Sequence, residues 1–175
     1  MKTETKVELG ALACGITMVF IAIHMSGFDS QPIDADPPSI VEVDNTPDIL
    51  RLLRAICEEE SGGDLRAVGD KNMKEWSRGP YCITEPYWID GVEQLRREGE
   101  KSLADSLKYM RDVWTMDNSE IIIKAYWRRY APDGATAEQL SRLHNGGPTG
   151  HKKTSTLAYW KRIQTIMIKQ RKEDE

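Results

Sequence analysis

Cysteine is scarce in this sequence, with three among 175 residues. So few cysteines exclude the class of small proteins whose fold depends on a disulfide framework, and an odd number leaves one thiol without a partner inside the chain. An excess of basic residues is also missing, since the formal net charge is −4. That balance argues against nucleic acid as a partner, because phosphate binding relies on a basic surface. Without repeats or low-complexity tracts, the length predicts one globular domain with a short additional segment.

Charged residues are missing from one stretch near the start of the chain. From Leu9 to Phe28 there is no Asp, Glu, Lys or Arg, and a helix of that length spans roughly 30 Å, the thickness of a bilayer core. Lys2 and Lys6 precede it, which favours an N-terminus in the cytoplasm and the remainder outside. We therefore expect residues 1–28 to be an uncleaved signal anchor that enters the membrane through residues 9–28. The alternative is a cleaved signal peptide and a secreted protein.

The rest of the chain divides into a linker and a folded domain. Residues 29–45 contain three prolines and little apolar content, which is typical of an extended linker. Residues 46–175 show helical periodicity, interrupted by a stretch rich in Gly, Asp, Asn and Pro between Glu60 and about Tyr87. The predicted fold class is α+β, mostly α, with a small loop or β-hairpin lobe. The expected helices cover about residues 46–60, 102–116, 118–130, 136–145 and 154–169.

The starts of these helices are predicted from capping residues. Thr46 is a good N-cap and is followed by proline. Ser102 with Asp105, and Thr136 with Gln139, resemble capping boxes. The expected caps of the remaining two helices are Asn118 or Ser119 and Thr154 or Ser155. The helix from Thr136 is expected to end at the Asn145–Pro148 segment.

Three consecutive glutamates end the first expected helix, and their helical phase separates them. Because a helix turns about 100° per residue, Glu58, Glu59 and Glu60 cannot share a face. Glu60 follows Ile56 by four residues and Leu53 by seven, which places it in the apolar stripe, whereas Glu58 points toward solvent and Glu59 lies at the flank. A carboxylate on a buried face should have a raised pKa, as a general acid needs. The alternative is a polar residue at the domain edge.

A second carboxylate is expected in the following loop. Glycosidases pair an acid with a second carboxylate on the other side of the scissile bond. Asp70 is the leading candidate, with Asp64 and Glu75 behind it. A turn residue that bonds its own backbone would have the same sequence, so the pairing stays a hypothesis at this stage.

Aromatic side chains gather just beyond this loop. Tyr81, Tyr87 and Trp88 follow it, and Trp76 lies within it. Sugar rings present apolar faces that stack on aromatic side chains, so the cluster suits a glycan-binding cleft. An ordinary hydrophobic core would use the same residues.

Three ordered blocks resemble the invertebrate-type (i-type, destabilase-like) lysozymes. The first is Ile56–Gly62 (ICEEESG), which matches the family's ESG segment, and the second is Gly79–Asp90 (GPYCITEPYWID), which matches its GPYQIxxxYWxD segment. The third, Arg142–Gly150 with Thr156–Trp160, is similar to the block HNGGPxG…TxxYW. Together they cover about residues 53–164, nearly the whole predicted domain.

The resemblance implies a lysozyme-like fold and hydrolysis of the bond between N-acetylmuramic acid and N-acetylglucosamine in peptidoglycan, without cofactor or metal. Glu60 falls on the family's catalytic glutamate. The family's catalytic aspartate, counted forward from Glu60, lands near Asn72, and aligned through Val68–Gly69 it lands on Asp70. We choose Asp70 because only it ionises. The implied substrate-binding residues are Ser61, Tyr81, Tyr87, Trp88, His144, Asn145 and Gly146.

Several alternatives remain open. His144 and Asn145 either line the cleft, hold the catalytic loop or only terminate a helix. The family is dense in cysteine and carries Gln where this chain has Cys82, so Cys57 and Cys82 either form a disulfide or are buried thiols. A lytic transglycosylase acting with Glu60 alone, and a non-catalytic wall-binding module, are the rival functions. Oligomeric state is not predicted.

The apolar stretch has a resemblance of its own. Its small residues make it only moderately apolar, and in this it resembles the signal-arrest-release anchors of phage endolysins, which can leave the bilayer. Cys14 lies within it. Thiol exchange between Cys14 and Cys57 or Cys82 would then be a means of holding the enzyme inactive until release.

Overall fold

The computed structural model describes residues 47–69, 71–72 and 74–175. They form a mostly helical domain with one small antiparallel sheet, as the sequence predicts. The expected anchor (residues 1–28) and linker (29–45) lie outside the described residues. Within the described residues, no helix is both long and apolar enough to cross a membrane. The elements are α1 Pro47–Ser61, β1 Val68–Gly69, β2 Ser77–Arg78, α2 Glu85–Arg97, α3 Lys101–Ser106, α4 Tyr109–Asp112, α5 Met116–Tyr130, α6 Ala137–Gly146, the 3-10 turns η1 Gly150–Lys152 and η2 Thr154–Thr156, and α7 Leu157–Asp174.

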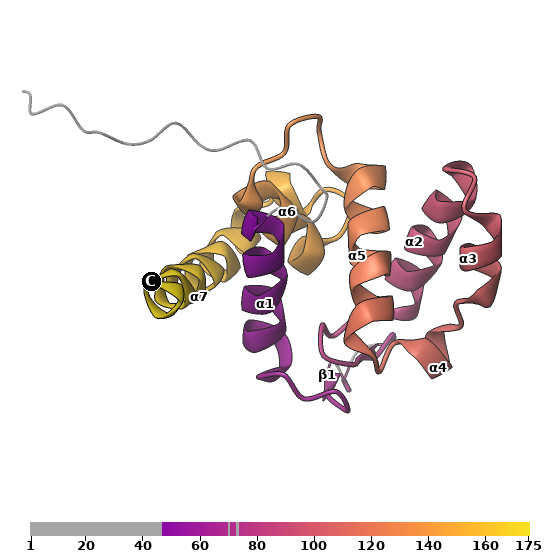
Figure 1. Ribbon diagram of the computed structural model, residues 1–175, viewed down its shortest axis with the longest axis horizontal. Helices are drawn as coiled ribbons and strands as arrows, with labels where there is room; N and C mark the ends of the chain where they lie inside the picture. The colour runs from indigo at the N-terminus through magenta and orange to yellow at the C-terminus, as the bar shows by residue number, and fades with distance from the viewer. Residues whose placement is uncertain (1–46, 70, 73) are drawn as a thin grey trace, which may run out of the picture. The chain divides into compact units, whose positions relative to one another are not determined.

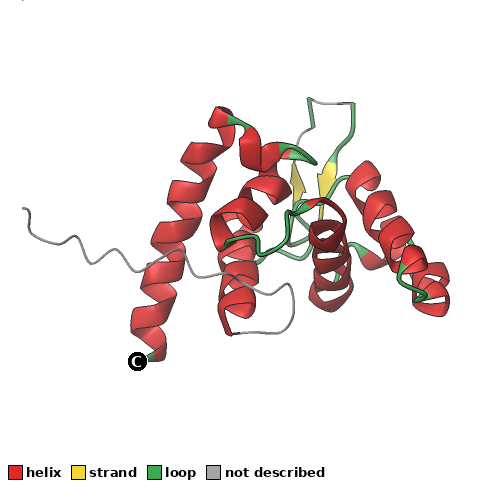
Figure 2. Ribbon diagram, turned by 90° about the horizontal axis from the view of Figure 1, so that it is seen from above, coloured by secondary structure: helices red, strands yellow, loops and turns green. Residues whose placement is uncertain are grey.

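Helix α5 is the centre of the domain, with α1 on one side and α2 and α3 on the other (Figure 1). Its buried face includes Ile122, Ile123 and Trp127, each fully inaccessible to solvent. Helix α2 approaches α5 closely at Gly91, where an added Cβ would lie 2.8 Å from the Cγ2 atom of Ile122 and 2.9 Å from its carbonyl oxygen. The long helix α7 packs against α1 and α6 at the edge of the domain (Figure 2).

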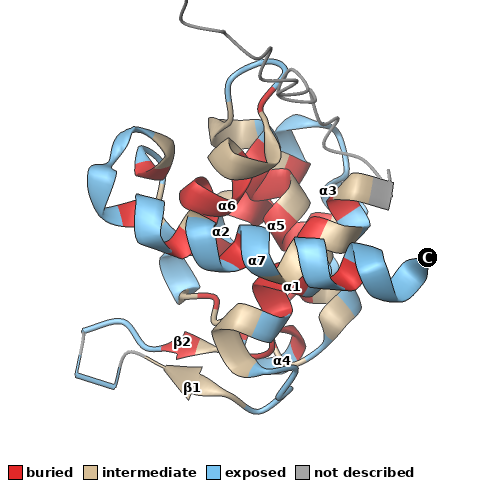
Figure 3. Cartoon of the chain, turned by 90° about the vertical axis from the view of Figure 1, so that its left-hand side faces the viewer, coloured by how far each residue is buried: buried red, intermediate tan, exposed pale blue. Residues whose placement is uncertain are grey.

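The small lobe lies below the helices in Figure 3, with most of its residues at the surface. Strands β1 and β2 pair Val68 with Arg78 and Gly69 with Ser77. The turn that follows is fixed from the helical side, because the hydroxyl of Tyr109 donates a hydrogen bond to the carbonyl of Ile83 at 2.9 Å. This turn brings Pro80 and Tyr81 back to the end of α1, where the hydroxyl of Ser61 donates to the Pro80 carbonyl at 2.8 Å.

Two capping predictions have opposite outcomes. The box of Thr136 and Gln139 is present at the start of α6, with both reciprocal hydrogen bonds, and α6 ends at Gly146 as the terminator predicts. The prediction that Ser102 caps one helix running to Met116 is wrong, because α3 begins at Lys101 with Glu100 as its N-cap. The expected helix is divided at Leu107, which is extended and buried, and the carboxylate of Asp112 accepts the Lys108 amide at 2.6 Å to begin α4.

The other boundaries shift by a few residues. Helix α5 begins at Met116, before the expected caps, and α7 begins at Leu157 after the turn η2 that contains Thr154 and Ser155. Helix α2 was not among the helices expected from the sequence.

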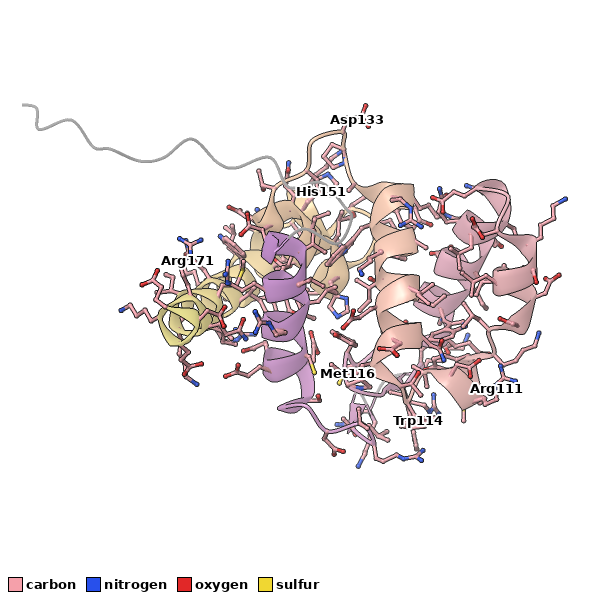
Figure 4. The ribbon with its side chains drawn as sticks, viewed as in Figure 1. Arg111, Trp114, Met116, Asp133, His151 and Arg171 are labelled. Carbon is pink, nitrogen blue, oxygen red and sulfur yellow. The ribbon has the colours of Figure 1, made fainter. Side chains whose placement is uncertain are left out.

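Cys57 and Cys82 form no disulfide in this part of the chain. Cys57 is buried beside Met116, whose sulfur lies 3.9 Å from the Cys57 Sγ atom, and Figure 4 labels Met116 where the start of α5 lies beside the end of α1. The Cys82 thiol, half-buried, donates to the backbone carbonyl of Glu60 at 3.4 Å. Of the two alternatives, the disulfide is therefore wrong; Cys14 lies outside the described residues.

Candidate active site

A cleft of about 400 Å³ opens where the end of α1, the first half of α2, the second half of α5 and the end of α6 meet. Two carboxylates line it, and one comes from α1 and the other from α2. The lining also includes two tyrosine rings and the segment that ends α6. Its residues are Glu60, Cys82, Thr84, Pro86, Tyr87, Asp90, Tyr126, His144, Asn145, Gly147 and Pro148.

Glu60 reaches this cleft because of its helical phase. Its side chain is 19% exposed, against 44% for Glu58 on the opposite face. Glu59, at the flank, is 20% exposed and forms an ion pair with Arg162 of α7. The predicted orientation of Glu58 toward solvent and of Glu60 toward the interior is therefore confirmed.

His144 of α6 stands beside Glu60 with both ring nitrogens engaged. The Nε2 atom lies 3.1 Å from the Tyr81 carbonyl oxygen, and the Nδ1 atom lies 3.3 Å from the Tyr87 hydroxyl. A carbonyl only accepts, so Nε2 carries the proton and Nδ1 accepts from Tyr87. The nearest Glu60 oxygen is 3.9 Å from Nε2, beyond hydrogen-bond distance.

The His144 ring is held neutral. Burial lowers its pKa to about 4, against the smaller opposing effect of the Tyr81 carbonyl. At neutral pH the ring is therefore an uncharged imidazole next to the Glu60 carboxyl group.

Tyrosine rings surround the Glu60 carboxyl group on its other sides. Tyr87 stacks on Tyr126 with ring centroids 3.6 Å apart, which joins α2 to α5 beneath the cleft. Tyr159 of α7 is buried next to Glu60: burial raises the pKa of its hydroxyl far above the usual value, and the Glu60 charge raises it further. The carboxyl group thus sits among aromatic rings at the wall of a water-accessible cleft.

Comparison with known proteins agrees with these observations. The model of the Destabilase family matches residues 51–166. The chain belongs to the destabilase family. It is 39% identical over 122 residues to a lysozyme of Meretrix lusoria, which covers 66% of this chain and 88% of the relative. Over 120 residues it is 32% identical to invertebrate-type lysozyme 6 of Caenorhabditis elegans, covering 65% of this chain and 83% of the relative.

Solved structures share the fold of this destabilase-family chain. A chain in the crystal structure of Aeromonas hydrophila PliI in complex with Meretrix lusoria lysozyme superposes with a TM-score of 0.51 at 31% identity, covering 73% of this chain and 92% of that one. The crystal structure of Tapes japonica lysozyme gives 0.50 at 29% identity, covering 66% and 88%. The lysozyme-like fold expected from the sequence is therefore confirmed.

The structure brings some of the expected site residues of this destabilase-family chain together and leaves others apart. Tyr87, His144 and Asn145 line the cleft with Glu60. Ser61 and Tyr81 stand behind its wall: Ser61 holds the Pro80 carbonyl, and the hydroxyl of fully buried Tyr81 donates to Glu120 at 2.6 Å.

Two further expected residues do not line the cleft. Trp88 lines a separate groove of about 290 Å³ between α2 and α4. At Gly146 an added Cβ would meet the Thr156 side chain at 2.6 Å, so this glycine allows η2 to pack against α6.

None of the candidates for the second carboxylate lines the cleft among the residues that the structure describes. Asp70 lies outside the described residues. Asn72 and Glu75 are exposed in the lobe, and Asp64 accepts the Arg66 amide at 2.8 Å, as a turn residue does.

Asp90 lines the cleft and was not singled out from the sequence. It follows Tyr87 by three residues on α2, a spacing that puts both side chains on one helical face. That spacing was visible in the Gly79–Asp90 block, but it becomes informative only once α2 is recognised as a helix.

Proposed function

We propose that this protein is a lysozyme, a glycoside hydrolase that cleaves the bond between N-acetylmuramic acid and N-acetylglucosamine in the glycan strands of peptidoglycan. The observation that carries the proposal is the position of Glu60: it lines the cleft beside a neutral His144, inside the region that the Destabilase family model matches. The relatives named lysozymes support the same activity.

Glu60 acts as the general acid in this proposal. Its proton passes to the glycosidic oxygen as the bond to the anomeric carbon breaks, and the leaving sugar departs as an alcohol. The surroundings suit this role, because the rings of Tyr159 and Tyr87 keep much of the water away and the neutral imidazole adds no positive charge.

Asp70 is the proposed second catalytic group. It follows β1 directly, and at Gly69 an added Cβ would lie 3.8 Å from the Sγ atom of Cys82, a residue of the cleft wall. The end of β1 is thus next to the cleft, which supports a carboxylate from this loop acting on the substrate. Water then completes hydrolysis at the anomeric carbon.

The decisive experiment is a digest of purified peptidoglycan by the full chain and its variants. We expect Glu60→Gln to lower kcat by roughly 10²- to 10⁴-fold with an unchanged thermal midpoint. Glu58→Gln, on the exposed face of the same helix, is the matched control and should retain activity. Asp70→Asn should also lose most of it, and an active Asp70→Asn enzyme would remove that residue from the proposal.

The products separate the rival functions. Hydrolysis leaves reducing N-acetylmuramic acid ends, whereas a lytic transglycosylase leaves anhydro-muramyl ends. A wild-type protein that binds the wall without releasing either product would be a non-catalytic module.

The cellular setting is part of the proposal. Residues 9–28 anchor the enzyme in a membrane, and the catalytic domain works outside the cytoplasm in lysis of the bacterial cell wall; secretion after cleavage is the alternative. The absence of charge from residues 9–28 supports this. Membrane fractionation of the full chain tests it, and comparison with Cys14→Ser tests whether the thiol matters for retention.

A further inference from the structure

Tyr159 of α7 is a buried titratable side chain of which the proposed chemistry uses only the ring. The residue is 3% exposed, and its hydroxyl oxygen is inaccessible to solvent. Burial raises the pKa of this hydroxyl, and the Glu60 carboxylate raises it further, both as a charge and as a hydrogen-bond acceptor. At standard distances and angles the hydroxyl has no partner among the described residues, so its contact with Glu60 is not yet ideal. Hydrogen bonds at a catalytic group are often loose without substrate and tighten when it binds.

Contacts along α7 hold Tyr159 against the end of α1. Arg162, one turn further on, forms an ion pair with Glu59 and lies over the Tyr159 ring, with 5.7 Å between the guanidinium carbon and the ring centroid. Ile163, on the same helical face as Tyr159, is fully buried. The residue next to Glu60 is thus bound by the turn of α7 that follows Tyr159. These contacts fix the rotation of α7 against α1 and direct Tyr159 toward Glu60.

Three other donors around Glu60 are engaged elsewhere. The Nε2 proton of His144 goes to a backbone carbonyl of the turn after β2, and Nε2 lies 3.9 Å from the nearest Glu60 oxygen. The Tyr87 hydroxyl donates to His144 Nδ1, and the Cys82 thiol donates to the backbone of Glu60 and not to its carboxylate. Tyr159 is therefore the donor best placed for the carboxylate. The remaining titratable residues that line the cleft are Asp90 and Tyr126.

A phenol in this position would affect the acid in two ways. When it donates to one oxygen of the Glu60 carboxyl group, the catalytic proton is carried by the other oxygen, which can then turn toward the cleft. After that proton has passed to the substrate, the same hydrogen bond stabilises the carboxylate that is left. Tyr159 itself is not among the residues that line the cleft, so it meets Glu60 and not the substrate.

We infer that Tyr159 is a positioning residue for the catalytic acid, and that its hydroxyl donates a hydrogen bond to the Glu60 carboxyl group from behind the wall of the cleft. The role of Glu60 as the acid rests on the proposed function. Because Tyr159 acts through Glu60, its hydroxyl affects the rate of bond breaking and the pH dependence of that rate more than the binding of substrate.

The test compares the full chain with Tyr159→Phe, which keeps the ring and removes only the hydroxyl, on soluble peptidoglycan fragments over a range of pH. The lost hydrogen bond favours ionised Glu60, and the acid must be protonated to act. Its removal should therefore move the alkaline limb of the rate profile up by about one pH unit. Below that limb, kcat should fall roughly tenfold while KM stays within about twofold.

Tyr109→Phe is the matched control, because it removes another buried phenol hydroxyl, one that donates to the Ile83 carbonyl. It should lower stability but leave the alkaline limb where it is in the parent. A second measurement needs no turnover. Titration of the Glu60 carboxyl group by NMR, assigned with Glu60→Gln, should show the same upward shift in Tyr159→Phe and none in Tyr109→Phe.

The outcomes separate the inference from the proposed function. An unmoved limb and an unmoved NMR midpoint in a folded Tyr159→Phe variant would refute the hydrogen bond, and any loss of kcat would then come from packing. A limb that moves down would mean that the hydroxyl accepts from protonated Glu60 instead. An active parent without the NMR shift in Tyr159→Phe refutes the inference alone. A parent in which the shift is present but peptidoglycan is not degraded supports the contact and refutes the proposed function.

Discussion

The imidazole of His144 is a buried polar group whose hydrogen bonds hold the cleft together. Through Nδ1 it accepts from Tyr87 of α2, and through Nε2 it donates to the Tyr81 carbonyl in the turn after β2. Protonation would add a charge to a side chain that is 3% exposed and would convert Nδ1 into a donor facing a hydroxyl. Protonation of His144 should therefore lower the stability of the fold in acid.

The direction in which stability changes with pH follows from the pKa of His144. This pKa is about 4 in the folded protein, whereas its ordinary value is 6.5. Between these values the unfolded chain binds a proton that the folded chain does not, so stability falls as pH falls. We expect a loss of about 2–3 kcal/mol from this group between pH 7 and pH 4.5.

Urea unfolding at the two pH values measures this loss. His144→Gln should have lower stability but a clearly smaller dependence on pH. Partial burial and the nearby charges of Lys152 and Arg142 also lower the pKa of half-buried His151, so His151→Gln should reduce the pH dependence as well, but by less than His144→Gln. Equal pH dependence in the parent and His144→Gln would contradict the prediction.

At the residue scale, the sequence predicted that Glu60 faces the site but did not predict that Asp90 does. The two cases differ in how far along the chain the residues lie that decide each position. Glu60 could be placed from Leu53 and Ile56, which lie within two turns of the same helix. Asp90 joins the site only because α2 packs on α5 at Gly91 and presents its start to the end of α1. No local pattern contains that long-range contact.

At the scale of elements, the turn at Gly79 joins the small lobe to α4. Its φ is +76°, and an added Cβ would lie 1.9 Å from the Val113 carbonyl oxygen. Gly99, after α2, has a similar φ of +89° but no atom within 4 Å of an added Cβ. Comparing substitutions at the two glycines separates the free-energy cost of a left-handed backbone from that of a steric clash with Val113.

Gly99→Ala should cost about 1 kcal/mol of stability, as a left-handed residue with a free side chain does. Gly79→Ala should cost about 3 kcal/mol or more, because the atom that it meets is backbone and the turn carries the Tyr81 carbonyl to His144. Denaturant unfolding of both variants provides the comparison. Similar losses at the two sites would mean that α4 moves aside easily.

The helix boundaries that the sequence predicted are those fixed by neighbouring residues. Thr136 and Gln139 form a capping box within one turn, so the start of α6 could be predicted. Ser102 belongs to an equally good local pattern, but Leu107 turns into the core and the Asp112 carboxylate accepts the Lys108 amide where a new helix begins. Burial of one leucine decided between two arrangements that local propensity does not distinguish.

At the scale of the whole molecule, the described domain is held by packing around α5 and not by cross-links. Its buried apolar side chains form one continuous core that draws on every α-helix. The Cys57 thiol belongs to that core, and burial raises its pKa, which makes it a poor nucleophile. A reducing environment should therefore leave the fold intact.

A disulfide between Cys57 and Cys82 would close a loop of about 25 residues and contribute about 3 kcal/mol, which corresponds to a thermal midpoint roughly 6–12 °C higher. We expect no such difference when the Cys14→Ser chain is melted with and without a phosphine reductant. Thiol titration under native conditions should leave Cys57 unreacted, and unfolding should expose it. A midpoint that drops by several degrees in reductant would mean that the two thiols do pair, and that the end of α1 and the turn before α2 move toward each other to allow it.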